Sequence, residues 1–484
     1  MHLSTALKKV FAIASCAFLG AAITLLVVSV LYVNNKPDPE IWHTVVLESE
    51  FTAQSNVRTL DGYRQAEYRL FGELQQRIVD KLQPDRQSII NRFTPGSRSD
   101  PGRWPENWNR TYEFKADEPV AGILLLHGLS DSPYSLRHLA AYLHGKGAWV
   151  VGLRLPGHGT APSALTDTRW QDMAAAVRLA MMHLKDNLGD KPLYIVGYSN
   201  GAALAINYAL TALDREDLPR ARRLVLLSPA IGITPMAEFA VWQARLGKLL
   251  GLEKLAWQDI LPEYDPYKYQ SFAINAGDLE YRLTAANQRL LEKRSADGTL
   301  QNFPPTLAFL SAVDATVSTR SAVEKFFMKL KPNGHELVVF DLNRRAGIEH
   351  LFTVDPGAAI ETLLNDRTLP FTFAVISNLD PDTSEVGMRI NKAGIPSIEN
   401  NRTGLKWPDG MYSLSHVALP FPPDDPLYGG PDAEKSPGIA LGNVALRGEK
   451  GVLKVPAKDM LRQRWNPFYS VIQDMAGDYL LNNR

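Results

Sequence analysis

The chain has 484 residues, of which 45% are hydrophobic, and its 52 basic side chains are balanced by 52 acidic ones. This composition supports one large globular core of roughly 250–300 residues with additions, and it excludes a net charge that would attract nucleic acid. The single cysteine, Cys16, lies in an apolar N-terminal stretch, so the folded part is expected to contain no disulfide, cysteine nucleophile or cysteine metal site.

The N-terminal stretch at residues 10–33 carries no charge and is long enough to cross a bilayer as one helix. Lys8 and Lys9 precede it, whereas Asp38 and Glu40 follow it. The positive-inside rule therefore predicts a cytoplasmic tail at residues 1–9 and a transmembrane anchor, with the catalytic domain facing the periplasm. Two alternatives remain open, a cleaved signal peptide and a lipoprotein signal ending at Cys16.

Residues 34–110 are predicted to form a linker and an N-terminal helical extension. Apolar side chains recur at helical spacing over residues 61–82, which indicates a helix packed against the main domain. A stretch rich in Pro, Gly and Ser at 94–105 follows and marks a domain boundary.

Short apolar segments then alternate with helical patterns. They lie at 122–126, 149–153, 193–196, 224–227, 307–310 and 337–342. This alternation predicts an α/β fold with a mostly parallel central sheet flanked by helices. The first part of this core spans 111–230, and we expect the functional residues at the carboxyl ends of the strands.

A G-x-S-x-G motif centred on Ser199 stands between one of these strands and a helix rich in small residues. A serine in such a strained turn is held out for attack, and only small neighbours let the helix return against the strand. The setting therefore predicts that Ser199 is a nucleophile.

The stabilisation of an oxyanion can be assigned to two backbone N–H groups. One belongs to Asn200, and the other is expected from Leu129 in the loop after the first strong strand. We interpret His127 in the same loop as a supporting polar residue, because it comes too early in the chain to be the base.

Three motifs together carry a resemblance to a known family: His-Gly at 127–128, Pro-Gly-His-Gly at 156–159 and Gly-Tyr-Ser-Asn-Gly at 197–201. They resemble the monoglyceride lipase and lysophospholipase branch of the α/β-hydrolases, which also includes serine aminopeptidase-like members. The resemblance covers residues 112–342, about half of the chain, and implies an α/β-hydrolase fold and a Ser-His-Asp triad.

In this fold the acid follows the serine and precedes the histidine. Asp314 comes just after the strand at 307–310 and is our candidate acid. Its predicted role is to fix the imidazole tautomer and to stabilise the imidazolium.

Two histidines compete for the role of base. His335 precedes its strand and so lies at the wrong end of the sheet, whereas His350 and His416 both follow Asp314 at usable positions. His350 has the more ordinary spacing. We choose His416, which requires an insertion containing an extra strand at 371–377 but is followed by a Pro-rich, conformationally fixed loop. Its segment also resembles the end of bacterial membrane-anchored hydrolases.

The segment between the strands at 224–227 and 307–310 is predicted to be a helical lid, residues 231–304. It carries a set of large apolar residues at helical spacing: Phe239, Trp242, Leu246, Leu249, Leu250, Leu255 and Trp257. Such a lid suits an acyl chain, although the same residues could pack only on one another. The second part of the core is then expected at 305–430, with a C-terminal extension at 431–484.

These assignments predict a serine hydrolase of carboxylic esters, with a lipid ester of the monoacylglycerol or lysophospholipid type as substrate and the bilayer as partner. A serine aminopeptidase is one alternative, and it would need lid acids to bind a free amino terminus. The candidates are Glu263, Asp265, Asp278 and Glu280. A non-catalytic membrane-anchored scaffold is the other. The sequence contains no metal-binding, Walker or dinucleotide motif, so we expect neither metal nor organic cofactor, and it leaves the oligomeric state open.

Overall fold

The structure is a computed structural model. It describes residues 11, 13–20, 24, 35–232, 253–346, 352–353, 355–442, 455 and 461–482.

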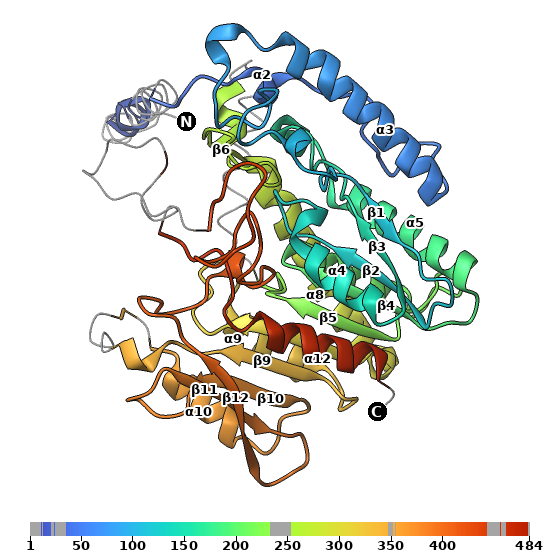
Figure 1. Ribbon diagram of the computed structural model, residues 1–484, viewed down its shortest axis with the longest axis vertical. Helices are drawn as coiled ribbons and strands as arrows, with labels where there is room; N and C mark the ends of the chain where they lie inside the picture. Colours follow the sequence, from blue (N-terminus) through green and yellow to red (C-terminus); the bar gives the residue numbers. More distant parts are fainter. Residues whose placement is uncertain are drawn as a thin grey trace, which may run out of the picture.

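A ten-stranded sheet forms the centre of the molecule (Figure 1). The strands run in the order β1-β3-β2-β4-β5-β8-β9-β10-β11-β12, and those from β3 to β10 are parallel. Their bounds are β1 Tyr112–Phe114, β2 Ala121–Leu126, β3 Ala148–Leu153, β4 Leu193–Tyr198, β5 Arg223–Leu227, β8 Thr306–Ser311, β9 Glu336–Phe340, β10 Thr372–Asn378, β11 Glu385–Asn391 and β12 Ile398–Lys406. A separate hairpin pairs β6 Trp257–Asp259 with β7 Phe272–Ala273.

Both faces of the central strands are buried, which explains their continuous apolar sequences. In β2, Ile123 and Leu125 belong to one hydrophobic cluster, whereas Leu124 and Leu126 belong to the other. Successive side chains of a strand point to opposite faces, so a strand with apolar residues at every position must be covered on both sides.

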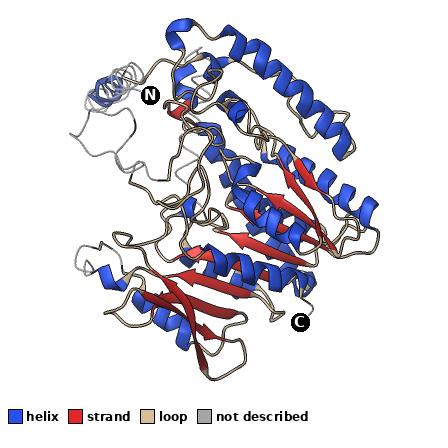
Figure 2. Cartoon of the chain, viewed as in Figure 1, coloured by secondary structure: helices blue, strands red, loops and turns tan. Residues whose placement is uncertain are grey.

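Helices cover the two faces unequally (Figure 2). One face packs against a large group of helices: α5 Trp170–Leu188, α6 Asn200–Thr211, α8 Ile274–Ala296, α9 Thr319–Lys325 and α10 Gly357–Asn365. The other face packs against α4 Arg137–Gly145 and α12 Tyr469–Leu481. The last helix of the C-terminal extension is therefore part of the core, because Phe468 and Ile472 are fully buried against the sheet.

The N-terminal extension contains α2 Ile41–Thr44 and α3 Leu60–Arg77, which runs along one side of the molecule (Figure 1). The helix predicted over residues 61–82 is present, and it ends at Arg77. The extension is joined to the core by buried polar contacts: the Tyr63 hydroxyl donates to the Arg154 carbonyl at 2.6 Å, and the Arg154 guanidinium binds both oxygens of Glu50.

Short 3-10 helices connect the larger elements. They are η1 Val79–Lys81, η2 Pro84–Arg86, η3 Pro101–Arg103, η4 Pro133–Leu136, η5 Pro162–Thr166, η6 Glu253–Ala256, η7 Thr299–Asn302, η8 Phe327–Lys329, η9 Arg344–Ala346 and η11 His416–Ala418.

All six predicted parallel strands are present, and the predicted extra strand at 371–377 corresponds to β10. β10 extends the parallel sheet beyond β9, and β11 and β12 then add two antiparallel strands that the sequence did not predict. Three additional strands therefore stand between β9 and the segment that carries His416.

Two predicted segments fall largely outside the described residues. Within 10–33 only residues 11, 13–20 and 24 are described, and among the helices that can be described none has the length and hydrophobicity that crossing a bilayer requires. The lid segment, 231–304, is described at its first two residues and again from 253 onward, where η6, β6, β7 and α8 lie. Of the apolar lid residues named above, only Leu255 and Trp257 are described, and both are buried.

Candidate active site

Ser199 occupies the tight turn between β4 and α6. Its backbone has a positive φ of 54° with ψ −116°, a conformation that a non-glycine residue adopts only under strain. The N–H of Ser199 donates to the Leu227 carbonyl of β5 at 2.9 Å, which fixes the turn to the neighbouring strand. The strand, turn and helix that the sequence predicted around Ser199 are therefore present.

The two glycines of the motif are required by close backbone contacts. A Cβ at Gly201 would lie 2.1 Å from the carbonyl oxygen of Leu126, and one at Gly197 would lie 2.5 Å from the Cα of Ala202. Neither neighbour is a flexible side chain that could move away. Glycine is thus the residue that allows α6 to pack against the ends of β2 and β4.

The imidazole of His416 connects the serine to the acid. Its Nε2 lies 3.0 Å from Ser199 Oγ, and its Nδ1 lies 2.8 Å from Asp314 Oδ2. All three groups are shielded from solvent, since Ser199 and His416 are 6% and 5% exposed and the carboxylate of Asp314 is fully buried. We call these three residues the relay. In this arrangement Nε2 can accept the hydroxyl proton while Nδ1 donates to the carboxylate.

Asp314 is held in its ionised form by its neighbours. Burial alone would raise its pKa, but His416 and the N–H groups of Val317 and Thr316 outweigh burial and keep the pKa of this carboxyl below its ordinary value. Oδ1 accepts both N–H groups, at 2.9 and 2.8 Å. Oδ2 is therefore directed at the imidazole.

The two residues predicted to supply oxyanion donors directly follow Ser199 and Gly128 in the chain. Asn200 is the first residue of α6, where a helix leaves its N–H groups without intrahelical partners. The loop of Leu129 approaches from β2, and a Cβ at Gly128 would lie 3.4 Å from the Cβ of Ser199. A substrate carbonyl over Ser199 would thus have backbone donors within its neighbourhood.

The side chain of His127 connects this loop to the turn after β3 by two hydrogen bonds. Its Nε2 accepts from the Leu155 N–H at 3.0 Å, so Nδ1 carries the proton and donates to the Gly128 carbonyl at 2.8 Å. Burial holds the pKa of His127 well below its ordinary value, which keeps the ring neutral. The ring ties the turn after β3 to the loop that contains Leu129.

Three hydrogen bonds to other parts of the chain fix the segment that carries His416. Ser311 at the end of β8 donates to the Leu414 carbonyl at 2.8 Å, and the Asn343 side chain donates to the Met411 carbonyl at the same distance. Ser415 bonds to the carbonyl of Gln463 in the C-terminal extension. His416 itself begins η11, and its carbonyl accepts from the Tyr198 hydroxyl at 3.3 Å.

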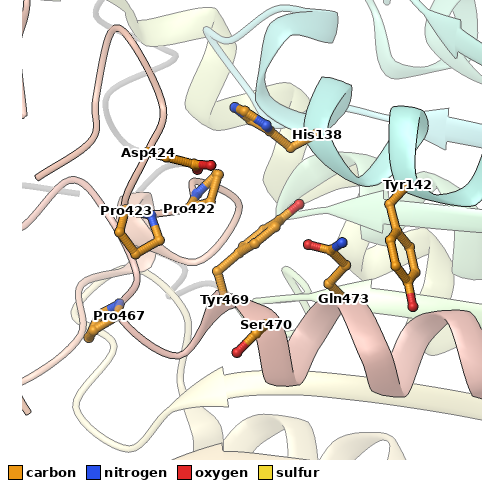
Figure 3. Close-up of a pocket in the computed structure, with 9 residues that line it drawn as sticks. All are labelled: His138, Tyr142, Pro422, Pro423, Asp424, Pro467, Tyr469, Ser470 and Gln473. Carbon is orange, nitrogen blue, oxygen red and sulfur yellow. The ribbon is translucent and has the colours of Figure 1, made fainter. Parts of the chain in front are cut away.

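Asp425 fixes the Pro-rich loop that follows. Its buried carboxylate accepts from Tyr134 and binds both Arg137 and His138 at 3.0–3.1 Å. These three partners lie in η4 and α4. These elements come directly after residues 127–132, the loop between β2 and η4, which we call the oxyanion loop. Figure 3 shows that Pro422, Pro423 and Asp424 line a surface cavity together with residues of α4 and α12; no relay residue lines it.

The other candidate base, His350, lies outside the described residues. His335 directly precedes β9, at the amino end of that strand as expected, and its carbonyl accepts from the N–H of Thr372. Among the described residues no group of His, Cys, Asp and Glu side chains has the geometry of a metal site.

A cavity of about 620 Å³ is lined by chain neighbours of the relay residues and by none of the three relay residues themselves, and its charged lining was not foreseen from the sequence. Ser130, Thr316 and Val417 line it, each within two residues of a predicted site residue. Lys268, Arg462 and Arg464 line it too. The sequence held no signal for these cations, because they come from two irregular segments that only the folded chain brings together.

Comparison with known proteins identifies relatives for the central part of the chain. Residues 117–341 match the family model described as serine aminopeptidase, S33. The phospholipase YtpA of Bacillus subtilis (strain 168) is 30% identical over 123 residues, covering 25% of this chain and 45% of its own length. A thermostable monoacylglycerol lipase of Bacillus sp. (strain H-257) is 30% identical over 124 residues, covering 26% and 46%. The chain thus spans less than half the length of these curated relatives.

Solved structures are more distant in sequence. The monoacylglycerol lipase of Paleococcus ferrophilus is 21% identical with a TM-score of 0.36, over 48% of this chain and 87% of that one. A soluble variant of the Saccharomyces cerevisiae monoglyceride lipase is 15% identical with a TM-score of 0.36, over 47% and 81%. The strand order, the serine turn and the matched model agree: this chain contains an α/β-hydrolase fold, and residues 117–341 of it match the serine aminopeptidase S33 family.

Proposed function

We propose that this protein is a serine hydrolase that cleaves carboxylic esters. The observation that carries the proposal is the pair of hydrogen bonds that links Ser199 Oγ to His416 and His416 to Asp314, at 3.0 and 2.8 Å. Ser199 also occupies a strained turn of the kind that exposes such nucleophiles.

The first half of the reaction forms an acyl-enzyme. Ser199 Oγ attacks the ester carbonyl carbon while His416 Nε2 takes the hydroxyl proton, and the N–H groups of Asn200 and Leu129 stabilise the oxyanion. When the tetrahedral intermediate collapses, the bond to the alcohol oxygen breaks and Nε2 returns the proton to the alcohol.

The second half releases the acid. Water attacks the acyl carbon, His416 takes a proton from this water, and the bond to Ser199 Oγ breaks as the proton passes to that oxygen. Asp314 remains ionised throughout and stabilises the imidazolium. Water is the only co-substrate, and neither metal nor organic cofactor takes part.

For the substrate we propose a lipid ester of the monoacylglycerol or lysophospholipid type, as the names of the two Bacillus relatives suggest. The lining of the cavity includes Leu261, Phe272 and Phe421, whose apolar side chains would contact an acyl chain. We further propose that residues 231–304 act as a lid and that residues 10–33 anchor the protein in a membrane, with the catalytic domain on the periplasmic side. The enzyme and its lipid substrate would then share one surface.

The aminopeptidase alternative is weakened by the lid acids. Glu263 accepts from two backbone N–H groups, Asp265 is hydrogen-bonded to Tyr428, and Asp278 pairs with Arg282 at 2.7 Å. Burial raises the pKa of Glu280 to about 7, so this carboxyl is a poor partner for an ammonium group. Three cations also line the cavity, and they would repel a free amino terminus.

The test compares p-nitrophenyl esters of increasing acyl length with aminoacyl p-nitroanilides. We expect ester hydrolysis that improves with chain length, by up to about fourfold in kcat/KM for each CH₂ that becomes buried. Hydrolysis of the anilides but not the esters would favour the peptidase. Failure of a fluorophosphonate probe to label Ser199 would favour the non-catalytic scaffold.

A further inference from the structure

The cavity beside the relay contains more positive charge than an acyl chain needs. Ser130 belongs to the oxyanion loop, Thr316 follows Asp314 and Val417 follows His416, so one wall of the cavity is formed by neighbours of the reacting groups. A ligand in this cavity would therefore contact residues that stand one or two positions along the chain from Leu129, Asp314 and His416.

Lys268 is a half-buried cation in the lining of this cavity. In the part of the chain that the structure describes, its ammonium group forms neither a hydrogen bond nor an ion pair. Its backbone is fixed, since the Lys268 N–H donates to Asp265 at 3.1 Å and the next residue, Tyr269, donates to the Ser130 carbonyl at 2.8 Å. The backbone that carries the Lys268 side chain is thus fixed to the loop after β2.

Two guanidinium groups from the C-terminal extension share the lining. Arg462 donates to the Thr316 hydroxyl at 3.0 Å, and Arg464 lies 3.5 Å from the Tyr264 hydroxyl. Each of these contacts uses one N–H donor, and a guanidinium has five. Both side chains are half-buried, and among the described residues these are the hydrogen bonds that the two guanidinium groups donate.

Asp131 and Asp265 lie near Lys268 and offset part of the positive charge, and each of them has further partners. Asp265 is buried and its carboxylate accepts from the Tyr428 hydroxyl at 2.6 Å and from the Tyr267 N–H at 2.9 Å. Asp259 lines the cavity from β6 and is exposed. Asp131 belongs to the loop after β2 and is buried, and burial raises its pKa to about 6 despite the neighbouring Lys268.

The titration of Lys268 agrees with this arrangement. Burial lowers its pKa first, and the positive charges of Arg462 and Arg464 lower it further, against the opposite effect of Asp131 and Asp265. An anion between the three cations would relieve this repulsion.

We propose that Lys268, Arg462 and Arg464 bind a phosphate group on the alcohol side of the ester, so that the preferred substrate is an acyl ester bearing a phosphate. The inference rests on the proposed function. Three cationic side chains from two separate segments line one cavity, and they suit a tetrahedral anion with several oxygens, whereas a planar carboxylate would be satisfied by one guanidinium.

The experiment measures kcat/KM for two substrates of equal acyl length, a 1-acylglycerol 3-phosphate and the corresponding 1-monoacylglycerol. It uses the full-length protein and the variants Lys268→Met and Arg462→Gln. The matched control is Lys293→Met, because Lys293 is an exposed lysine of α8 that does not line the cavity. The ratio of the two kcat/KM values is expected to fall about 10- to 100-fold in both variants and to stay unchanged in the control.

The monoacylglycerol, which carries no phosphate, distinguishes failure of the proposed hydrolase function from failure of the proposed phosphate site. If the original protein cleaves neither ester, the proposed function itself is wrong. If it cleaves both and the ratio is the same in Lys268→Met as in the original protein, the phosphate site is wrong and the hydrolase stands. Inhibition by inorganic phosphate that the variants abolish, without any change in the ratio, would mean that the cations hold a free anion, and it would overturn the proposal for the substrate.

Discussion

The two sides of the relay are built differently. Ser199 and Asp314 stand at the ends of parallel strands, β4 and β8, where the sheet fixes their positions through neighbouring backbone. His416 begins the short 3-10 helix η11 after three additional strands, and its segment is held by individual side-chain hydrogen bonds and by Asp425. A catalytic residue on a strand end is thus specified locally, whereas one on a long loop depends on contacts far away in sequence.

The largest expected effect comes from removing the histidine. His416→Ala should reduce kcat for a p-nitrophenyl ester by about 10⁴- to 10⁶-fold, because it removes the imidazole nitrogen that lies 3.0 Å from Ser199 Oγ and takes its proton. His350→Ala, which removes the competing candidate, should leave kcat within about threefold of the original value. Loss of activity in His350→Ala with survival in His416→Ala would reverse the assignment of the base.

Removing the negative charge of Asp314 should reduce kcat somewhat less than removing the imidazole of His416. Asp314→Asn is expected to lower kcat about 10³- to 10⁴-fold, since the amide can no longer fix the productive imidazole tautomer. Thermal unfolding should still be a single transition, because Asn can keep one acceptor for the N–H groups of Thr316 and Val317. A kcat within tenfold of the original would show that Asp314 is not the partner of His416.

The dependence of the loop on distant contacts can be tested at Asp425. Asp425→Asn removes the buried negative charge that pairs with Arg137, and we expect a loss of about 3–5 kcal/mol in the free energy of unfolding together with a decrease in kcat. The neighbouring Asp424→Asn is the control, because this side chain is exposed. Urea unfolding of both variants measures the difference. Equal stability in the two variants would mean that Asp425 does not anchor the loop.

The smallest effect is expected in the N-terminal extension. Burial lowers the pKa of His43 to about 3. The unfolded chain therefore takes up a proton near pH 6.5 whereas the folded protein does not, so stability falls as the pH decreases from about 6.5 towards 3. Protonation of His43 in the unfolded chain lowers the free energy of unfolding by up to about 1.4 kcal/mol for each pH unit of decrease in this window.

Urea unfolding between pH 6.5 and 4 should accordingly show a shallower pH dependence for His43→Gln than for the original protein. Parallel curves would contradict the burial of a neutral imidazole at this position. His43 Nε2 contacts Ser271 Oγ at 2.8 Å, so the same variant also tests how the extension docks on the segment after β6.

Much of the sheet could be predicted, because strands buried on both faces have continuous apolar sequences. β12 could not, since Ile398–Lys406 is largely polar and exposed and has no periodic apolar pattern. The turn around Ser199 was predictable because close backbone contacts at Gly197 and Gly201 restrict the residue types.

The remaining features of the site depend on tertiary contacts. Spacing along the chain favoured His350, whereas the bonds of Ser311 and Asn343 that position the segment of His416 link residues about 70 to 100 apart. Arg462 and Lys268 approach one cavity from irregular segments, and no local pattern marks such residues.

The most direct test of the central claim is active-site labelling followed by peptide mass spectrometry. A fluorophosphonate should form one adduct on the peptide containing Ser199 in the original protein. The adduct should be absent from Ser199→Ala and should form far more slowly in His416→Ala. An adduct on a different serine, or unchanged labelling of Ser199 in His416→Ala, would contradict the relay described here.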